Sequence, residues 1–317
     1  MKFVVAGALG HIGSRLVRYL PEHFPGCEVT MVDNLTTQRV ASLFDLPRTG
    51  RYRFIEADVT KMDLGPLLRG ATAVVQLAAI TDAAGSFDRA REVETNNFQA
   101  TKRIAEACAE AGAALIAPSS TSVYGTQKDV VDEDCGPEDL KPQSPYAETK
   151  LKEEELLDTL SRAGLKVVRL RLGTIFGTSP GMRFHTAVNK FCWQAVFGVP
   201  LTVWRTAFDQ RRPYLDLTDA VRAIGFFLEE QHYDGRIYNV VTANATVREV
   251  VDRIRAEVPT LDVRFVDERI MNQLSYEVRA DRIQALGFRF TGDLCRGIAD
   301  TVALLHQANA GTPVAAR

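Results

Sequence analysis

Tyr146 and Lys150 stand four residues apart, directly after Pro145. At the start of a helix, this spacing places both side chains on one helical face. A phenol with a pKa near ~10 is a poor base at neutral pH, but a neighbouring ammonium favours the phenolate and lowers that pKa. The pair can therefore remove a proton from a hydroxyl group, which predicts that Tyr146 and Lys150 are catalytic.

Hydroxyl side chains are concentrated at 119–122, where the chain reads Ser-Ser-Thr-Ser before Val-Tyr-Gly. They follow the apolar run 114–118, which predicts a buried strand. Sites in α/β proteins form at the carboxyl ends of parallel strands. One of these hydroxyls could therefore hydrogen-bond the reacting oxygen and position it against Tyr146.

Gly7, Gly10 and Gly13 follow the apolar run 2–6 and precede a helical pattern. Glycines allow the backbone to approach a pyrophosphate, whose charge lies at the helix N-terminus. Asp33 ends the next apolar run, and a carboxylate there accepts hydrogen bonds from ribose hydroxyls and repels a 2′-phosphate. Because no arginine directly follows Asp33, the pattern predicts NAD rather than NADP.

Short apolar runs alternate with helical patterns through the first half of the chain. This alternation predicts a parallel sheet with helices on both faces, so the expected fold class is α/β with a doubly wound sheet. Pro21 is expected to end the first helix, and Gly112 and Gly164 to cap the others. The predicted strands are 2–6, 28–32, 53–56, 73–78, 114–118 and 166–172, and the predicted helices are 12–20, 89–111 and 147–163.

The pattern changes after about residue 173, where Gly, Pro and aromatic residues become frequent. Helices are predicted at 219–230 and 246–257, the second with a Thr246–Glu249 capping box, and a strand at 237–241. We predict a smaller α/β lobe that returns at least once to the main sheet. The expected division is 1–172 for a cofactor domain, 173–307 for the lobe and 308–317 for a frayed tail.

The composition limits the class of protein. The 317 residues carry a net charge of −2, which argues against a protein that binds nucleic acid or a membrane surface. No apolar run approaches the ~20 residues of a membrane span, and the start of the chain is interpreted as a strand rather than a signal peptide. The five cysteines are scattered without a C-x-x-C motif, which favours a reducing cytoplasm and no metal site.

These segments together resemble the extended form of the short-chain dehydrogenase/reductase superfamily, over roughly residues 1–290. The glycine spacing, the Tyr146–Lys150 pair and the segment 118–125 all match its signatures. The resemblance implies a Rossmann-type fold with NAD as cofactor. Matched on Val-Tyr-Gly, it places the catalytic hydroxyl on Ser120, with Thr121 and Ser122 as alternatives if the register slips.

The same resemblance implies cofactor contacts along the first half. Asp58 corresponds to the adenine contact, residues 77–79 to the loop beneath the nicotinamide ribose, and Asn97 to a helical motif in which Ala100 replaces the usual glycine. The predicted cofactor-binding residues are Gly7, Gly10, His11, Ile12, Gly13, Asp33, Asn34, Asp58, Val59, Leu77, Ala78, Ala79, Asn97, Tyr146, Lys150 and Leu172.

Segments of the second half resemble the substrate-binding parts of the family. Thr174 replaces an Asn that usually contacts the sugar nucleotide, Trp204 is expected to pack against the base, and Arg212 to bind the diphosphate. The predicted substrate-binding residues are Thr81, Thr121, Ser122, Thr174, Arg183, Asn189, Thr202, Trp204 and Arg212, with Asp82 and Gln273 as further candidates.

The residues beside the motif narrow the reaction. The 4,6-dehydratases of the family usually carry Asp and Glu directly after the catalytic hydroxyl, where this chain has Thr121 and Ser122. The resemblance therefore implies an NAD-dependent 4-epimerase, most like the UDP-galactose 4-epimerase group. Its substrate would be a UDP-hexose or UDP-hexuronic acid, and its assembly a homodimer through the helices at 89–111 and 147–163. The alternatives are a dehydratase, a decarboxylase, a dehydrogenase or a non-catalytic NAD-sensing protein.

Overall fold

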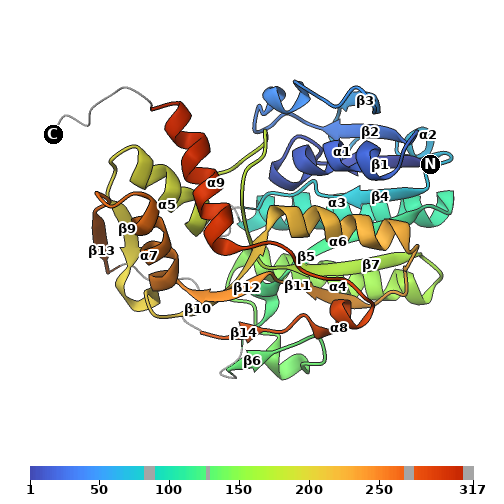
Figure 1. Ribbon diagram of the computed structural model, residues 1–317. Coiled ribbons are helices and arrows are strands. Elements are labelled where there is room, and N and C mark those ends of the chain that lie inside the picture. The colour runs from blue at the N-terminus through green and yellow to red at the C-terminus, as the bar shows by residue number, and fades with distance from the viewer. Residues whose placement is uncertain (82–89, 126–128, 268–274, 310–317) are drawn as a thin grey trace.

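A seven-stranded parallel sheet forms the centre of the computed structural model, which describes residues 1–81, 90–125, 129–267 and 275–309 (Figure 1). The strand order is β11-β7-β5-β4-β1-β2-β3. This arrangement confirms the α/β class with a large parallel, Rossmann-type sheet. The strands are β1 (Lys2–Ala6), β2 (Glu28–Asp33), β3 (Arg51–Glu56), β4 (Ala73–Gln76), β5 (Ala114–Ser120), β7 (Val167–Leu172) and β11 (Ile237–Val240).

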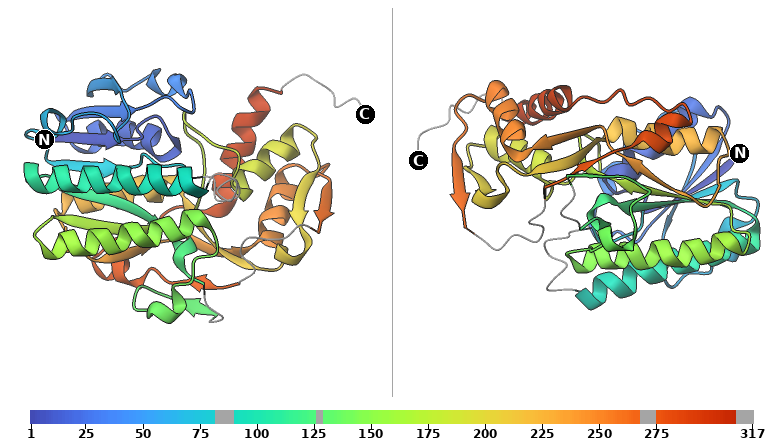
Figure 2. Two further views of the ribbon diagram at one scale, coloured as in Figure 1. Left: turned by 180° about the vertical axis from the view of Figure 1, so that it is seen from behind. Right: turned by 90° about the horizontal axis from the view of Figure 1, so that it is seen from below.

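Helices cover both faces of this sheet (Figures 1 and 2). Successive side chains of a strand point to opposite faces, so Phe3 and Val5 of β1 join one core cluster and Val4 and Ala6 the other. Both faces are buried, which explains why the strands are almost uninterrupted apolar runs. One face carries α1 (His11–His23), α6 (Leu217–Glu229) and α8 (Asp281–Ala285), and the other carries α2 (Gly65–Leu68), α3 (Ala90–Ala111) and α4 (Pro145–Arg162).

A second, smaller unit lies beyond the carboxyl ends of the strands (Figure 1). Its core packs Phe191, Val251 and Ile298 from three different helices. Its helices are α5 (Ala187–Val196), α7 (Val247–Glu257) and α9 (Leu294–Gln307). Its strands are β8 (Thr174–Phe176), β10 (Arg211–Asp216) and β12 (Ala243–Thr246) in one sheet, and β9 (Leu201–Trp204) with β13 (Val263–Val266) in another.

Shorter elements connect these layers. The strands β6 (Val130–Val131) and β14 (Glu277–Val278) pair in parallel beside the main sheet. Single 3₁₀ turns are η1 (Val40–Leu43), η2 (Thr121–Val123), η3 (Pro137–Asp139) and η4 (Arg205–Ala207). Of these, η2 matters most for function, because it directly follows β5 and carries the hydroxyl segment.

Several local predictions are confirmed. Gly112 and Gly164 follow their helices with φ of 70° and 108°, conformations that glycine adopts without strain. Glu249 N–H donates to Thr246 Oγ1 at 3.1 Å, and Thr246 N–H donates to Glu249 Oε2 at 2.6 Å, which completes the capping box. The pairing of β11 with β7 returns the second half of the chain to the main sheet.

The predicted end of the first helix at Pro21 is wrong, because α1 continues to His23. Proline lacks a backbone N–H, so one intrahelical hydrogen bond is lost at Pro21, but the helix continues for two more residues. Leu20 and Pro21 are both buried, and Phe24 N–H still donates to the Leu20 carbonyl at 2.8 Å. The strand predicted to reach residue 78 ends at Gln76, and Leu77 begins a loop.

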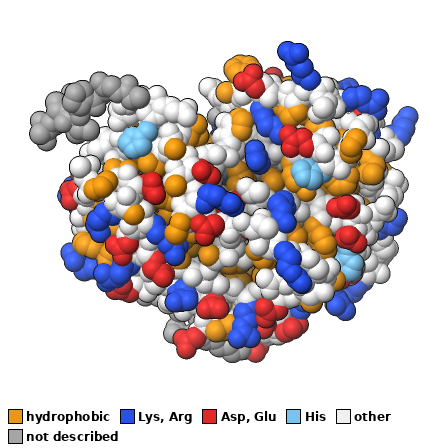
Figure 3. Space-filling view, viewed as in Figure 1, with side chains coloured by type: hydrophobic (Ala, Val, Ile, Leu, Met, Phe, Trp, Pro, Cys, Tyr) orange, Lys and Arg blue, Asp and Glu red, His pale blue; other side chains and the backbone are white. Residues whose placement is uncertain are grey.

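Three predictions fall on residues outside the described ranges: the sugar-contact candidates Asp82 and Gln273, and most of the tail 308–317. Within the described ranges, every helix is too short or too polar to cross a lipid bilayer. The same part of the chain holds no cluster of three His, Cys, Asp or Glu side chains suited to a metal ion. Basic and acidic side chains are interspersed over the face shown in Figure 3.

Candidate active site

The loop between β1 and α1 and the first helical turn after it pack tightly against neighbouring backbone, so two of their glycines have no room for a side chain. Gly7 has a φ of 74°, and a Cβ there would lie 2.5 Å from the Leu77 carbonyl carbon. A Cβ on Gly13 would lie 2.4 Å from the Gly7 carbonyl oxygen. Gly10 is the N-cap of α1 without a side-chain cap, and the first turn has no acidic residue. The first N–H groups of α1 have no acceptor within the helix, so this turn suits an anionic diphosphate.

One cavity of about 380 Å³ extends from this loop across β2, and is called the cofactor cavity below. Asp33 lies in its wall, where its carboxylate accepts hydrogen bonds from Leu9 N–H and Leu35 N–H, both at 3.0 Å. These bonds fix the carboxylate at the end of β2, as a ribose contact requires. The other predicted residues in this wall are Gly7, Gly10, Asn34, Asp58, Val59, Leu77, Ala78, Ala79 and Thr81.

Asn97 lines neither cavity described here. It is buried on α3, where its Oδ1 accepts a hydrogen bond from Ile80 N–H at 2.8 Å and its Nδ2 donates to the Ile80 carbonyl at 2.9 Å. Asn97 thus fixes the loop after β4 through the Ile80 backbone. Asn96 and Ala100 of the same helix line the cofactor cavity instead.

A second cavity of about 340 Å³, called the reaction cavity below, joins the two halves of the molecule. It contains Ser120, Tyr146 and Lys150, which the sequence places 26 and 4 residues apart. Ser144 caps α4 by accepting a hydrogen bond from Ala147 N–H, which starts the helix directly before Tyr146. The Lys150 ammonium lies 6.0 Å from the centre of the Tyr146 ring. The other predicted residues that line the reaction cavity are Gly7, Gly10, His11, Ile12, Gly13, Leu77, Ala79, Thr81, Thr121, Ser122, Leu172, Thr174, Arg183 and Arg212.

The three candidate hydroxyls differ in their surroundings. Thr121 is buried, and its Oγ1 donates to the Leu172 carbonyl at 3.3 Å. Ser120 is partly exposed, and its Oγ accepts a hydrogen bond from Ser122 Oγ at 2.8 Å. Because the Thr121 hydroxyl already binds backbone, the geometry favours Ser120, with Ser122 beside it, as the group that contacts substrate.

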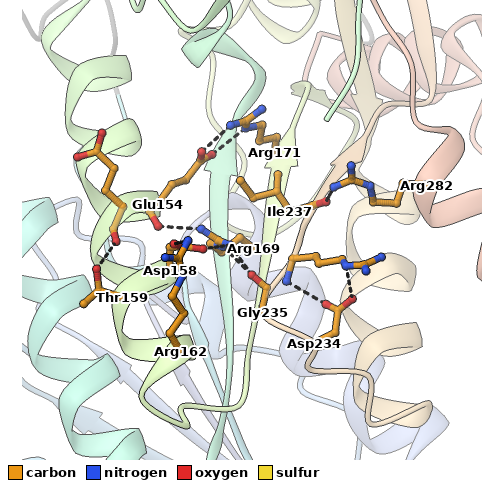
Figure 4. Close-up of polar contacts among 12 residues, drawn as sticks. Glu154, Asp158, Thr159, Arg162, Arg169, Arg171, Asp234, Gly235, Ile237 and Arg282 are labelled. Carbon is orange, nitrogen blue, oxygen red and sulfur yellow. Dashed lines mark hydrogen bonds and ion pairs between the residues drawn. The ribbon is translucent and has the colours of Figure 1, made fainter. Parts of the chain in front are cut away.

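A buried ion pair and neighbouring hydrogen bonds join α4 to the adjacent strand β7 (Figure 4). Arg171 on β7 donates to the Glu154 carboxylate from Nε at 2.9 Å and from Nη2 at 2.6 Å. Ser119 Oγ donates to the same carboxylate at 2.5 Å. Arg169 donates from Nη1 to the Glu154 backbone carbonyl at 2.8 Å. These contacts tie α4 to β5 and β7, so the helix that carries Tyr146 and Lys150 is held at the carboxyl end of the sheet.

Arginines reach the reaction cavity from three segments. Arg183 donates to Thr81 Oγ1, which joins the smaller unit to the loop after β4. Arg212 on β10 donates to Gln210, and burial lowers the pKa of its guanidinium. Arg39 lines both cavities. Among the described residues, the lining of the reaction cavity includes no Asp or Glu, so it suits an anionic ligand.

Three predicted substrate residues lie elsewhere. Asn189 is fully buried and binds backbone: it accepts a hydrogen bond from Gly177 N–H at 3.2 Å and donates to the Arg183 carbonyl at 3.2 Å. Trp204 and Thr202 stand on β9, which pairs with β13, and neither lines a cavity. The structure therefore assigns Asn189 to support of the Arg183 segment, and does not bring Thr202 or Trp204 to the described lining.

Sequence reasoning missed several lining residues, among them Arg39, His185, Thr186 and Tyr276. Arg39 follows Asp33 by six residues in the same loop, so a wider search for basic side chains after β2 could have found it. Tyr276 is buried, and its hydroxyl donates to the Thr121 carbonyl at 3.2 Å. No local pattern in the sequence indicates that contact, because it joins residues 155 positions apart.

Residues 177–183 form a connecting segment that joins the smaller unit to the glycine loop and the first turn of α1. Ser179 Oγ donates to the His11 carbonyl at 3.0 Å, and Gly181 N–H donates to Ser14 Oγ at 2.9 Å. A Cβ on Gly181 would lie 2.2 Å from the Leu9 carbonyl oxygen. The ring of His11 contacts the Gly177 carbonyl through Nε2 at 3.0 Å. Burial, together with Arg183, lowers the pKa of His11 to about 3, so its ring is neutral and Nε2–H donates.

Comparisons with known proteins agree with this geometry. The chain is 31% identical over 264 residues to the uncharacterized UDP-glucose epimerase YtcB of Bacillus subtilis, covering 80% of this chain and 81% of that protein. The structure of UDP-glucuronic acid 4-epimerase from Bacillus cereus, in complex with UDP-glucuronic acid and NAD, is similar with a TM-score of 0.87 and 26% identity, covering 97% and 100% of the two chains.

A dehydratase is also similar. The dTDP-glucose 4,6-dehydratase DesIV from Streptomyces venezuelae, solved with NAD and TYD bound, gives a TM-score of 0.84 at 26% identity, with 98% of each chain covered. The model of the NAD dependent epimerase/dehydratase family matches residues 3–240. NAD is the cofactor of this family, and the uncapped turn after Gly10 and the fixed Asp33 carboxylate fit it. The chain therefore belongs to the NAD dependent epimerase/dehydratase family.

Proposed function

We propose that the protein is a nucleotide-sugar 4-epimerase that acts on a UDP-hexose or a UDP-hexuronic acid through a transient 4-keto sugar. One observation carries this choice within the family. The described lining of the reaction cavity combines Ser120, Tyr146 and Lys150 with arginines and hydroxyls, and includes no carboxylate or thiol. Loss of water or exchange at a second carbon needs a further acid and base, whereas epimerisation at one carbon does not.

Each proposed role follows from the position of a side chain. The glycine loop and Asp33 would hold NAD, which would supply a hydride acceptor and donor at the sugar carbon. Tyr146 takes the proton of the 4-hydroxyl, and Lys150 stabilises the resulting phenolate by its charge. Ser120 donates a hydrogen bond to the reacting oxygen, which aligns it with Tyr146. The keto sugar then presents its other face and receives the same hydride and proton.

The proposed binding residues divide between the two cavities. Asp33 and Asp58 lie where the adenosine half of NAD would bind, and the N-terminal turn of α1 would hold its diphosphate. Arg212 and Arg183 are proposed to bind the diphosphate of the sugar nucleotide, because a guanidinium forms paired, charge-assisted bonds with phosphate. Thr174 replaces the amide expected from the family, so its hydroxyl would contact the sugar.

A direct assay tests the activity. Purified protein is incubated with UDP-glucose or UDP-glucuronic acid without added coenzyme, and products are followed by proton NMR. We expect inversion at C4 only, with no deuterium from D₂O at C3 or C5. Accumulation of NADH would indicate a dehydrogenase, and release of water or CO₂ a dehydratase or decarboxylase. Any of these outcomes would contradict the 4-epimerase assignment.

We also propose that the protein works in the cytoplasm as a homodimer, and that residues 1–172 and 173–307 are its cofactor and substrate parts. The helices α3 and α4 pack side by side on one face of the sheet and are the proposed dimer surface (Figure 2). Light scattering coupled to gel filtration measures the mass. A mass near 35 kDa, that of one chain, would contradict the dimer.

A further inference from the structure

The catalytic lysine candidate has a charged neighbour that the proposed mechanism does not use. Lys150 Nζ donates to Glu153 Oε2 at 2.9 Å and to the Pro118 carbonyl at 3.2 Å. The Lys150 and Glu153 side chains are 7% and 4% exposed. An ion pair on the surface is weak, but water does not screen a pair buried this deeply.

Glu153 is held in place from a second helix. Its Oε2 also accepts a hydrogen bond from Thr101 Oγ1 of α3 at 2.9 Å. Its Oε1 has no hydrogen-bond partner among the described residues. Burial raises the pKa of the Glu153 carboxyl, and the Lys150 ammonium opposes that effect. The carboxylate is therefore directed at the lysine rather than at solvent.

The charges around Lys150 come from few elements. On α4 itself these are Glu153, Glu154 and the ionisable Tyr146. On β7, Arg171 is paired with Glu154, as Figure 4 shows. The contact from β5 is the neutral Pro118 carbonyl, which accepts from Lys150, and the contact from α3 is the neutral Thr101 hydroxyl, which donates to Glu153.

With both carboxylates ionised, these two ion pairs are neutral while the Tyr146 phenol is neutral. Glu153 offsets the charge of Lys150, and Glu154 offsets that of Arg171. Ionisation of Tyr146 adds a third anion. Without Glu153, the same ionisation would instead neutralise an excess positive charge, which costs less in a buried site.

We propose that Glu153 is a positioning residue that fixes the Lys150 ammonium and offsets its charge, so that Tyr146 loses its proton at a higher pH than Lys150 alone would allow. This inference rests on the proposed function, because it takes Tyr146 as the acid–base group. It concerns the direction of the Tyr146 titration and not the identity of the sugar.

The test titrates Tyr146 directly in the NAD-loaded protein. The ultraviolet absorption of the phenolate is followed against pH, and the same titration with Tyr146→Phe is subtracted. Glu153→Gln keeps the size of the side chain and removes its charge. We expect it to lower the pKa of Tyr146 by about one unit. An unchanged or raised pKa would overturn the proposal.

A matched control and two further variants separate charge from structure. Glu94→Gln removes an exposed carboxylate of α3 that pairs with Lys152 of α4, and should leave the Tyr146 titration unchanged. If Glu153→Gln is unstable, Glu153→Met, which is also uncharged, must give the same downward shift. Glu153→Asp keeps the charge and must restore most of the original pKa; a shift as large as that of Glu153→Met would also overturn the proposal.

The titration and the sugar assay fail separately. The titration needs no sugar, so a wrong substrate assignment leaves it intact. If subtraction of Tyr146→Phe shows no titrating phenol between neutral and alkaline pH, the acid–base role in the proposed function is wrong. If Tyr146 titrates and Glu153→Gln does not move it, only the role of Glu153 is wrong.

Discussion

The two cavities share the glycine loop but differ in charge. The cofactor cavity has Asp33, Asp58 and Glu92 in its wall, together with Arg39. The reaction cavity has Arg39, Lys150, Arg183 and Arg212 and, among its described lining residues, no carboxylate. Carboxylates suit ribose hydroxyls, and guanidinium groups suit phosphate. The carboxyl edge of one sheet thus presents a cavity with acidic side chains beside a cavity with basic ones, although the net charge of the chain is only −2.

The largest effect should come from Tyr146→Phe. Removal of the phenolic hydroxyl deletes the proposed acid–base group, so kcat should fall about 1000-fold. The NAD content of the purified protein, measured by absorbance after denaturation, should not change. Tyr233→Phe is the control, because Tyr233 lies outside both cavities and should keep activity within about twofold. If the Tyr146→Phe variant turned over substrate normally, Tyr146 would not be the acid–base group, and the reaction cavity would lose its proposed catalytic role.

Arg212→Met tests the positive side of the comparison. Loss of paired bonds to a diphosphate should raise KM for the sugar nucleotide about 100-fold, with NAD binding unchanged. Arg211→Met is the matched control, since Arg211 is exposed and pairs with Glu277. Steady-state kinetics and NAD titration measure both quantities. Equal changes in the two variants would show that Arg212 has no special role.

Asp33→Asn tests the acidic side. The weaker acceptor should reduce NAD affinity by about 30-fold and narrow the preference for NAD over NADP, because a charged repulsion is lost. Asp63→Asn is the control, because Asp63 bonds the Gly65 N–H in an exposed turn outside both cavities. Calorimetry with each coenzyme measures the affinities of apoprotein. An unchanged NAD affinity would contradict the assignment of the cofactor cavity.

The smallest effect concerns the pH dependence of folding stability at His11, which directly follows the glycine loop. His11 has a pKa of about 3 in the folded protein and about 6.5 when unfolded, so the unfolded chain binds more protons between these values. Folding stability therefore falls as pH drops below 6.5, by about 1 kcal/mol at pH 5.5. His11→Gln, which keeps a donor for Gly177, should lose less Tm than wild type between pH 7.5 and 5.5. Equal losses in both proteins would contradict a neutral, buried His11.

The sequence signals in the cofactor half are local, and most of the residues predicted there line one of the two cavities. Glycines at fixed spacing, an acid at the end of a strand and a Tyr–Lys pair on one helical turn each depend on neighbours in sequence. The place of the hydroxyl segment after β5 was predicted from the apolar run before it, whereas the choice of Ser120 came from the family resemblance. Asn97 is the exception: it was expected at the cofactor, but it lines neither cavity and its amide binds the Ile80 backbone.

The smaller unit was harder to predict, because its lining depends on contacts across the chain. Asn189 was expected at the sugar and instead supports the Arg183 segment, and Trp204 stands on a strand paired with β13. Tyr276 enters the reaction cavity through a contact with Thr121 that no local pattern encodes. The Glu153 ion pair could be guessed from its spacing to Lys150, but its burial could not.

The connecting segment limits how this enzyme could be redesigned. Gly181 leaves no room for a Cβ beside the Leu9 and Gly10 carbonyls, and Ser179 and Gly181 bond residues of the glycine loop and α1. A chimera that takes residues 173–307 from a relative would therefore place a foreign segment against a loop that did not evolve with it. Exchange of sugar specificity should transfer residues 9–14 together with 177–183, as one module rather than two.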